Sequence, residues 1–134
     1  MSTQPDTQPD TQPDTQPDTQ PAVAFHMLLK NKWDALPPGS DYRADTLPVE
    51  GFVHCTAEPP MLVVVANRFY REQPGEWVIL AVDLQKVGAD VRWEEADGHL
   101  FPHIYGPIEQ HAVTRVVPFP RRQDGTYYLQ EGAL

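Results

Sequence analysis

The sequence has a single cysteine and no long apolar run, and both shortages narrow the classes of protein it can belong to. Cys55 cannot form a disulfide within the chain, which fits a reducing compartment. The longest apolar stretches, MLVVVA and WVILAV, are far too short to cross a bilayer, and no positively charged start precedes an apolar run. We therefore expect a soluble cytoplasmic protein without a membrane partner.

Basic residues are also scarce. The chain has 10 Lys and Arg against 19 Asp and Glu, a formal net charge of −9, so extended contact with a nucleic-acid backbone is not expected. Serine occurs only as Ser2 and Ser40, outside any nucleophile elbow, and the sequence contains neither a phosphate loop nor a glycine fingerprint for dinucleotides. These absences argue against a serine hydrolase and against the common nucleotide-binding motifs.

The first 21 residues consist largely of a fourfold TQPD repeat. The repeat contains no apolar side chain other than proline, so it cannot offset the entropy cost of ordering. We expect residues 1–21 to be a flexible tail and residues 22–134 to form one domain. One function that this suggests is a non-catalytic interaction module, in which the acidic surface and the tail recruit a basic partner.

Strand patterns dominate the remainder, together with two helical patterns. Residues 77–84, WVILAVDL, are apolar on both faces, as in a central strand that is covered on each side. The lack of regular alternation between strands and helices predicts an α+β fold around a curved or split sheet. The other expected elements are strands at 22–30, 51–56, 91–95, 103–106 and 112–119, an edge strand after a turn in 124–129, and helices at 31–36 and 57–73, with a loop at 97–102.

Both predicted helices begin after a polar residue that can cap them. Asn31 is the expected N-cap of the first helix, and Thr56 is the expected N-cap of the second. The second helix carries an apolar stripe with spacings of three and four, which predicts the face that covers the sheet: Leu62, Val65, Ala66 and Phe69.

Three of the five histidines lie in apolar strand contexts. These are His26, His54 and His103, and strand alternation places Tyr105 on the same side as His103. Each histidine taken alone is equally consistent with a buried ring that bonds a backbone carbonyl. Because three polar rings come from separate strands, we favour one shared cleft lined by all three and by Tyr105.

The segment VRWE adds charged candidates. Arg92 and Glu94 share one face of the predicted strand, either as a surface ion pair or as an arginine that holds an anion beside a carboxylate that stabilises a developing cation. Trp33 is expected in the core, with one edge available to line the cleft. No metal is predicted, because the histidines show neither HxH nor HExxH spacing.

Two motifs together, GFVHCT at 51–56 and FPHIYGPI at 101–108, resemble the bacterial domain-of-unknown-function family 952. The resemblance runs from about Phe25 to Leu129, with Thr56 where the family usually has serine and Pro60 where glutamine is common. It implies a fold similar to that of the ADP-ribosyltransferases, a split mixed β-sheet with two helices, which in active relatives holds NAD in a cleft between its halves.

The resemblance also implies residue roles. His26 matches the first-strand position that binds the nicotinamide ribose, His54 matches the second-strand position that supports the nicotinamide, and Glu94 is the candidate later acid. We therefore expect the cleft to bind a nucleotide such as NAD or ADP-ribose, with Arg92 and Trp33 as further contacts. The catalytic alternative is ADP-ribosyl transfer or hydrolysis with NAD as the substrate, and no other cofactor is expected.

Overall fold

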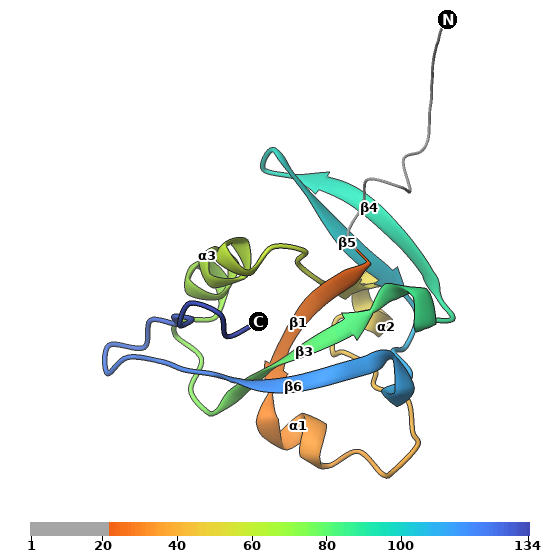
Figure 1. Ribbon diagram of the computed structural model, residues 1–134, viewed down its shortest axis with the longest axis horizontal. Coiled ribbons are helices and arrows are strands. Elements are labelled where there is room, and N and C mark those ends of the chain that lie inside the picture. The colour runs from red at the N-terminus through yellow and green to blue at the C-terminus, as the bar shows by residue number, and fades with distance from the viewer. Residues whose placement is uncertain (1–21) are drawn as a thin grey trace, which may run out of the picture.

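A three-stranded antiparallel sheet forms the centre of the fold. Its strands are β1 (Val23–Leu29), β3 (Trp77–Asp83) and β6 (Val113–Phe119), with β3 in the middle (Figure 1). The computed structural model describes residues 22–134, so the tail predicted for residues 1–21 lies outside the described part. Residues Trp77–Val82 of β3 are all buried, which confirms the central strand expected from a segment that is apolar on both faces.

A second antiparallel sheet has the order β2-β5-β4, with β2 at Val53–His54, β5 at His99–Tyr105 and β4 at Asp90–Ala96. Strands β4 and β5 form a hairpin, which stands at the top of Figure 1. Its two turn residues, Asp97 and Gly98, both have positive φ, as in the turns that favour two-residue hairpins. The loop predicted at 97–102 is therefore wrong, because this tight turn lets pairing resume at His99.

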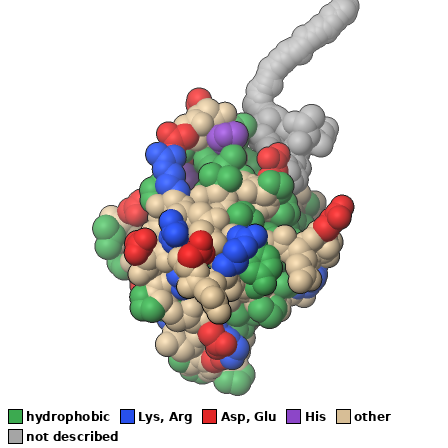
Figure 2. All heavy atoms as spheres, turned by 90° about the vertical axis from the view of Figure 1, so that its left-hand side faces the viewer, with side chains coloured by type: hydrophobic (Ala, Val, Ile, Leu, Met, Phe, Trp, Pro, Cys, Tyr) green, Lys and Arg blue, Asp and Glu red, His purple; other side chains and the backbone are tan. Residues whose placement is uncertain are grey.

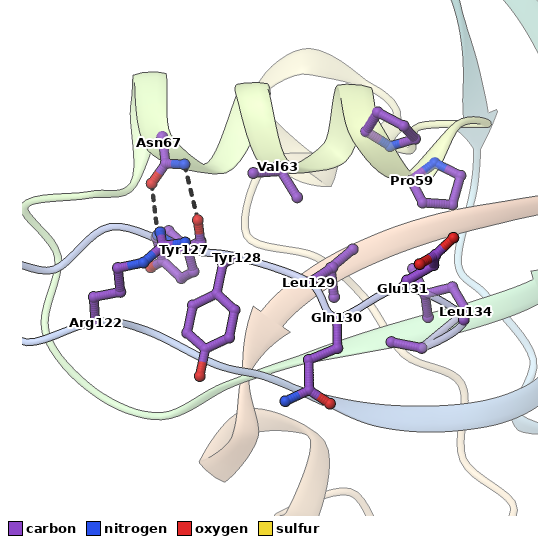
Figure 3. A pocket seen from close by; sticks show the side chains of 13 residues that line it. Pro59, Val63, Asn67, Arg122, Tyr127, Tyr128, Leu129, Gln130, Glu131 and Leu134 are labelled. Atoms are coloured by element: carbon purple, nitrogen blue, oxygen red, sulfur yellow. Dashed lines mark hydrogen bonds between the residues drawn. The ribbon is translucent and has the colours of Figure 1, made fainter.

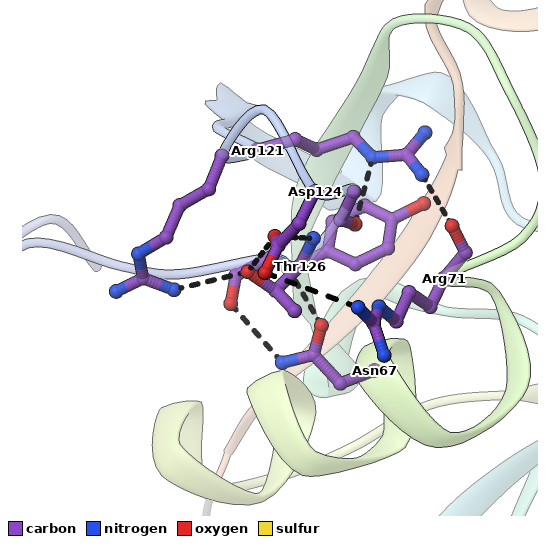
Figure 4. Close-up of polar contacts among 8 residues, drawn as sticks. Asn67, Arg71, Arg121, Asp124 and Thr126 are labelled. Carbon is purple, nitrogen blue, oxygen red and sulfur yellow. Dashed lines mark hydrogen bonds and ion pairs between the residues drawn. The ribbon is translucent and has the colours of Figure 1, made fainter.

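The sheets are separate and every strand pairing among residues 22–134 is antiparallel, so the α+β class is correct and the expected mixed sheet is not. The edge strand expected within 124–129 is absent, and only an isolated bridge joins Arg121 to Tyr127. Asn67 takes the place of a strand partner: its side chain accepts from the backbone N–H of Tyr127 and donates to the Tyr127 carbonyl (Figure 3). Asp124 accepts from the backbone N–H and the hydroxyl of Thr126 and pairs with Arg71 (Figure 4).

Residues 22–134 form three α-helices where two were expected: α1 (Lys30–Asp34), α2 (Leu47–Glu50) and α3 (Pro59–Phe69). Short 3₁₀ turns, η2 (Leu84–Lys86) and η3 (Gln110–Ala112), precede β4 and β6. The single-turn helix α2 has no apolar periodicity, which is why the sequence did not reveal it. Helix α2 is followed by Gly51, whose φ of 87° is accessible to glycine without strain.

The predicted N-caps are both wrong. Helix α1 begins after Leu29 and α3 after Glu58, and neither has a side-chain cap. The backbone of Thr56 instead pairs with Phe25 of β1, with hydrogen bonds in both directions. This pairing keeps Thr56 in extended conformation and moves the helix start to Pro59, a residue suited to the first helical position.

Helix α3 covers the larger sheet with a stripe different from the predicted one. Leu62 and Ala66 are buried, and Val63 and Tyr70 pack against the same core. Phe69 is 61% exposed and was wrongly placed in the core. Because the buried stripe passes through residues 63 and 70, the side of α3 that carries Phe69 is left outside the core.

No helix of residues 22–134 has the length and apolar character needed to span a membrane.

Candidate functional site

The outward face of the smaller sheet carries the polar side chains that the sequence singled out. Alternation along β5 buries Ile104 completely and turns His103 and Tyr105 to the other face. On β4, Arg92 is the register partner of His103. Glu94 lies two residues further along on the same face, so the sheet pleat itself brings these four side chains together.

Glu94 is the centre of this group. Its Oε1 accepts hydrogen bonds from Nδ1 of His103 at 2.7 Å and from the hydroxyl of Tyr105 at 2.6 Å. The hydrogen bonds from Tyr105 and His103 lower the pKa of Glu94, and the bond to Glu94 raises the pKa of Tyr105. The guanidinium carbon of Arg92 lies 4.3 Å from the centroid of the Tyr105 ring. Glu94 is therefore an ionised carboxylate that accepts hydrogen bonds from two side chains.

His54 adds a second imidazole–carboxylate pair. As the register partner of His103, it places its ring centroid 5.2 Å from that of His103. Its Nε2 lies 3.0 Å from Oε1 of Glu50, the last residue of α2. The Phe52 ring stacks on the His103 ring with centroids 4.2 Å apart. Glu50 was missed at the sequence level, although its position four residues before His54 is a usable signal once α2 is known.

Beside these imidazoles lies a cleft of about 560 Å³, bounded by α3 and by the outward face of the smaller sheet. Its size is within the usual range for small-molecule sites. The smaller sheet contributes His54, His103, His99 and Phe101. Cys55 and Thr56 also reach the lining. Helix α3 contributes mainly apolar side chains: Met61, Val64, Val65 and Phe69.

An ion pair connects the two walls of the cleft. Nη1 of Arg68, on α3, lies 3.1 Å from Oδ2 of Asp97 in the β4–β5 turn, and both residues line the cleft. Figure 2 looks onto the side of the molecule where α3 lies and shows acidic and basic side chains intermixed with hydrophobic ones, with histidine visible near the top. The contacts on this face are therefore mixed in charge and in polarity.

His26 does not line the cleft, which corrects the expectation that it joins His54, His103 and Tyr105 there. It is 8% exposed, with Nδ1 2.7 Å from the His54 carbonyl and Nε2 2.9 Å from the Tyr42 hydroxyl. Burial lowers the pKa of His26 to about 4, so the ring is neutral. His26 is thus a buried ring that bonds a backbone carbonyl, which was the other reading of each histidine, and its bond holds the backbone carbonyl of His54.

Four further candidates do not line the cleft: Trp33, Arg92, Glu94 and Tyr105. Trp33 packs against the core and lies edge-on to Tyr42 with centroids 6.3 Å apart, and it is not part of the lining. Tyr105, Glu94 and Arg92 contact His103 or one another but do not themselves line the cleft. Cys55 is a buried free thiol, and burial raises its pKa to about 12.

A second cavity, of about 610 Å³, lies between α3 and the C-terminal segment (Figure 3). Pro59, Val63 and Asn67 line it from α3, opposite residues 127–134. Asn67 is already bonded to the backbone of Tyr127, and the cavity has few charged groups. Among residues 22–134 no cluster of three or more His, Cys, Asp or Glu side chains can hold a metal ion. The cleft at His54 and His103 is thus the stronger candidate site.

Comparison with known proteins gives a family and a fold. A family model described as "Protein of unknown function (DUF952)" matches residues 27–116. The chain is similar to the crystal structure of protein CC0527 from Caulobacter crescentus, with a TM-score of 0.69 and 28% identity over 80% of this chain and 94% of that one. For the solution NMR structure of CC0527 the values are 0.62, 27%, 78% and 90%. No curated protein matches.

Proposed function

Because the chain belongs to the DUF952 family of proteins of unknown function, we propose its function from the cleft: it binds a small molecule of the nucleotide class, such as NAD or ADP-ribose. One observation carries the proposal. Two imidazoles, each held by a carboxylate, line a cleft of about 560 Å³ whose opposite wall is mainly apolar. A few convergent polar groups in a largely apolar concavity are typical of small-molecule sites.

The distribution of side chains suits the parts of a nucleotide. Phe69 of α3 and Phe101 of β5 both line the cleft, and aromatic side chains of this kind favour a planar base. The imidazoles of His54 and His103 suit a polar sugar. Arg68 lines the cleft and is the basic group available to a phosphate. To bind a phosphate, Arg68 would leave its exposed ion pair with Asp97.

We also propose that the fold is of the ADP-ribosyltransferase type. The division into two sheets, with a cleft against the outward face of one of them, supports this assignment. The antiparallel pairing of all the strands in the described part of the chain differs from the mixed sheet that the type implies. The binding proposal rests on the cleft and does not depend on this assignment.

Calorimetric titration with NAD and ADP-ribose tests the binding proposal. We expect heat with at least one of the two ligands, and an affinity at least about tenfold weaker for His103→Ala, because a hydrogen bond and ring packing are lost. His111→Ala is the matched control, since His111 is exposed on η3 and is not part of the cleft lining. Absence of heat with both ligands, at protein concentrations well above micromolar, would remove NAD and ADP-ribose from consideration.

A second candidate function is hydrolysis of NAD or transfer of its ADP-ribosyl group. The favouring observation is the Glu94–His103 pair, since a carboxylate that holds an imidazole is the arrangement of a general base. In hydrolysis, the bond between the ribose C1′ and nicotinamide breaks, nicotinamide leaves with the electron pair, a water oxygen bonds to C1′, and His103 takes the water proton. Glu94 then acts through His103 and not directly on the sugar cation.

Nicotinamide release by the wild type and by Glu94→Gln separates catalysis from binding. Catalysis through this pair predicts slower release by Glu94→Gln, because an amide does not stabilise the imidazolium that forms. Equal release by both proteins would exclude Glu94 from the reaction.

A further inference from the structure

We infer that the site recognises its ligand through two hydrogen-bond acceptors, Nε2 of His103 and Nδ1 of His54, and that the ligand group they fit is a vicinal diol such as that of ribose. This inference rests on the proposed nucleotide binding and specifies which part of the ligand the histidines contact. Its basis is the pairing of each imidazole with a carboxylate on a different ring nitrogen.

His103 is held with its proton on Nδ1. A carboxylate can only accept, so the bond of 2.7 Å to Glu94 requires Nδ1 to be the donor. The Tyr105 hydroxyl donates to the same Glu94 oxygen, and the lowered pKa of Glu94 keeps the carboxylate ionised. Nε2, on the opposite side of the ring, makes no hydrogen bond within residues 22–134. Glu94 is not part of the cleft lining and His103 is, so in its neutral form the His103 ring has its acceptor nitrogen, Nε2, on the side away from Glu94.

His54 has the opposite arrangement. Its Nε2 faces Oε1 of Glu50 at 3.0 Å, so Nε2 carries the proton and Nδ1 is the acceptor. Nδ1 likewise makes no hydrogen bond inside the part of the chain that the structure describes. The backbone carbonyl of His54 is held by His26, which fixes the strand on which the ring stands. The two neighbouring rings are therefore in different tautomers, and each has one free acceptor nitrogen.

Two adjacent acceptors select a ligand with two adjacent donors. The ring centroids are 5.2 Å apart, and His54, His103 and Glu50 all line the cleft, so the two rings can contact neighbouring groups of one small molecule. The vicinal hydroxyls of a ribose provide two O–H donors on adjacent carbons. A phosphate oxygen has no proton to give at neutral pH and meets only acceptors here, beside the negative charges of Glu50 and Glu94. The geometry therefore favours the sugar at the histidines and the phosphate elsewhere.

The tautomers can be tested on the free protein. A two-bond ¹H–¹⁵N correlation spectrum above pH 7 should show the proton of His103 on Nδ1 and that of His54 on Nε2. Glu94→Ala should return His103 to a mixture with the Nε2 proton favoured, because a neutral imidazole in water prefers that nitrogen. Tyr105→Phe is the matched control, since it removes the other donor to Glu94 and leaves the His103 bond intact. A proton on Nε2 of His103 in the wild type would overturn the inference.

The diol is tested with a pair of mononucleotides that differ in one hydroxyl. Adenosine 5′-phosphate should bind about tenfold more tightly than 2′-deoxyadenosine 5′-phosphate, the effect of one lost hydrogen bond. Glu50→Ala should reduce this preference, because His54 is then free to change tautomer. Where NAD or ADP-ribose binds, equal affinities for the two mononucleotides, or no binding of either, would overturn the diol assignment.

The failure of this inference can be distinguished from failure of the proposed function. If NAD or ADP-ribose binds and the two mononucleotides do not differ, nucleotide binding stands and the diol assignment falls. If no nucleotide binds, the proposed function falls, and titration with D-ribose and 2-deoxy-D-ribose judges the diol assignment by itself. Shifts of the His54 and His103 signals with ribose alone would support it, and their absence with both sugars would overturn it.

Discussion

His26 and His103 occupy similar sequence contexts and opposite structural ones. Both lie on strands between apolar neighbours, in AFHML and FPHIY. In β1 of the larger sheet, both ring nitrogens of His26 have partners inside the protein. In β5 of the smaller sheet, His103 has one partner, Glu94, and a side chain that remains 12% exposed at a cleft. The comparison teaches that the number of nitrogens already satisfied separates a structural histidine from a candidate binding residue.

The two sheets differ in the same way. The larger sheet has a core on each side, one that includes Leu80 and Val82 and one that includes Ile79 and Ala81 together with α3. The smaller sheet buries Ile104 on one face and leaves the other face to polar side chains and the cleft. The larger sheet is therefore packed on both faces, and the candidate chemistry lies on the open face of the smaller one.

The largest expected effect comes from shortening one leucine in each sheet. Leu80 of β3 is 0% exposed, so Leu80→Ala should lower the free energy of unfolding by about 4 kcal/mol through lost burial and a cavity. Leu100 of β5 is 53% exposed, so Leu100→Ala should lower it by less than about 1 kcal/mol. Chemical denaturation of both variants measures the difference. Similar losses for the two would contradict the difference in packing between the covered central strand and the open face of the hairpin.

The next effect is acid destabilisation through His26. Its pKa falls from 6.5 to about 4 in the folded protein, so below pH 6.5 the unfolded chain binds a proton that the folded chain does not. The free energy of unfolding should therefore fall by up to about 3 kcal/mol between pH 6.5 and pH 4. The full contribution of His26 is present above pH 6.5.

Two variants assign this acid effect to one histidine. His26→Gln should remove most of the pH dependence in that window, since the titrating group is absent, whereas His103→Gln should retain it. The measurement is the denaturation midpoint at a series of pH values. An unchanged slope for His26→Gln would show that the acid sensitivity has another source.

A smaller effect is expected from the ion pair that joins the cleft walls. The Arg68 and Asp97 side chains are both largely exposed, so a double-mutant cycle with Arg68→Ala and Asp97→Ala should give a coupling below about 1 kcal/mol. Hydrogen exchange near residues 96–99 should nevertheless be faster in Arg68→Ala, because the hairpin turn loses its contact with α3. Exchange that stays unchanged would show that the pair does not restrain the hairpin.

Much of the framework could be predicted from the sequence, because its signals are local. The apolar run at 77–84 predicted the central strand, and the alternation around residues 103–105 predicted that His103 and Tyr105 share a side. The sequence does not, however, show which distant residue a side chain contacts in the folded protein. His26 was placed in the cleft because its buried partner Tyr42, 16 residues away, has no pattern linking it to the strand.

The cleft itself was only partly predictable. Phe69 belongs to an apolar pattern, and only the packing of Leu62 and Ala66 on the larger sheet shows that Phe69 remains exposed and lines a cavity. Glu50 lies on α2, a single-turn helix that no periodicity indicates. Partners of this kind depend on tertiary contacts, which one sequence does not contain.

The most direct measurement of the central claim is a titration of the isotope-labelled protein with ADP-ribose, followed through the side-chain ¹H–¹⁵N signals of its histidines. The account predicts that the His54 and His103 signals shift progressively to saturation while the signals of the buried His26 stay in place. Saturation of the titration with His54 and His103 unmoved, or no response from any histidine at millimolar ligand, would contradict it.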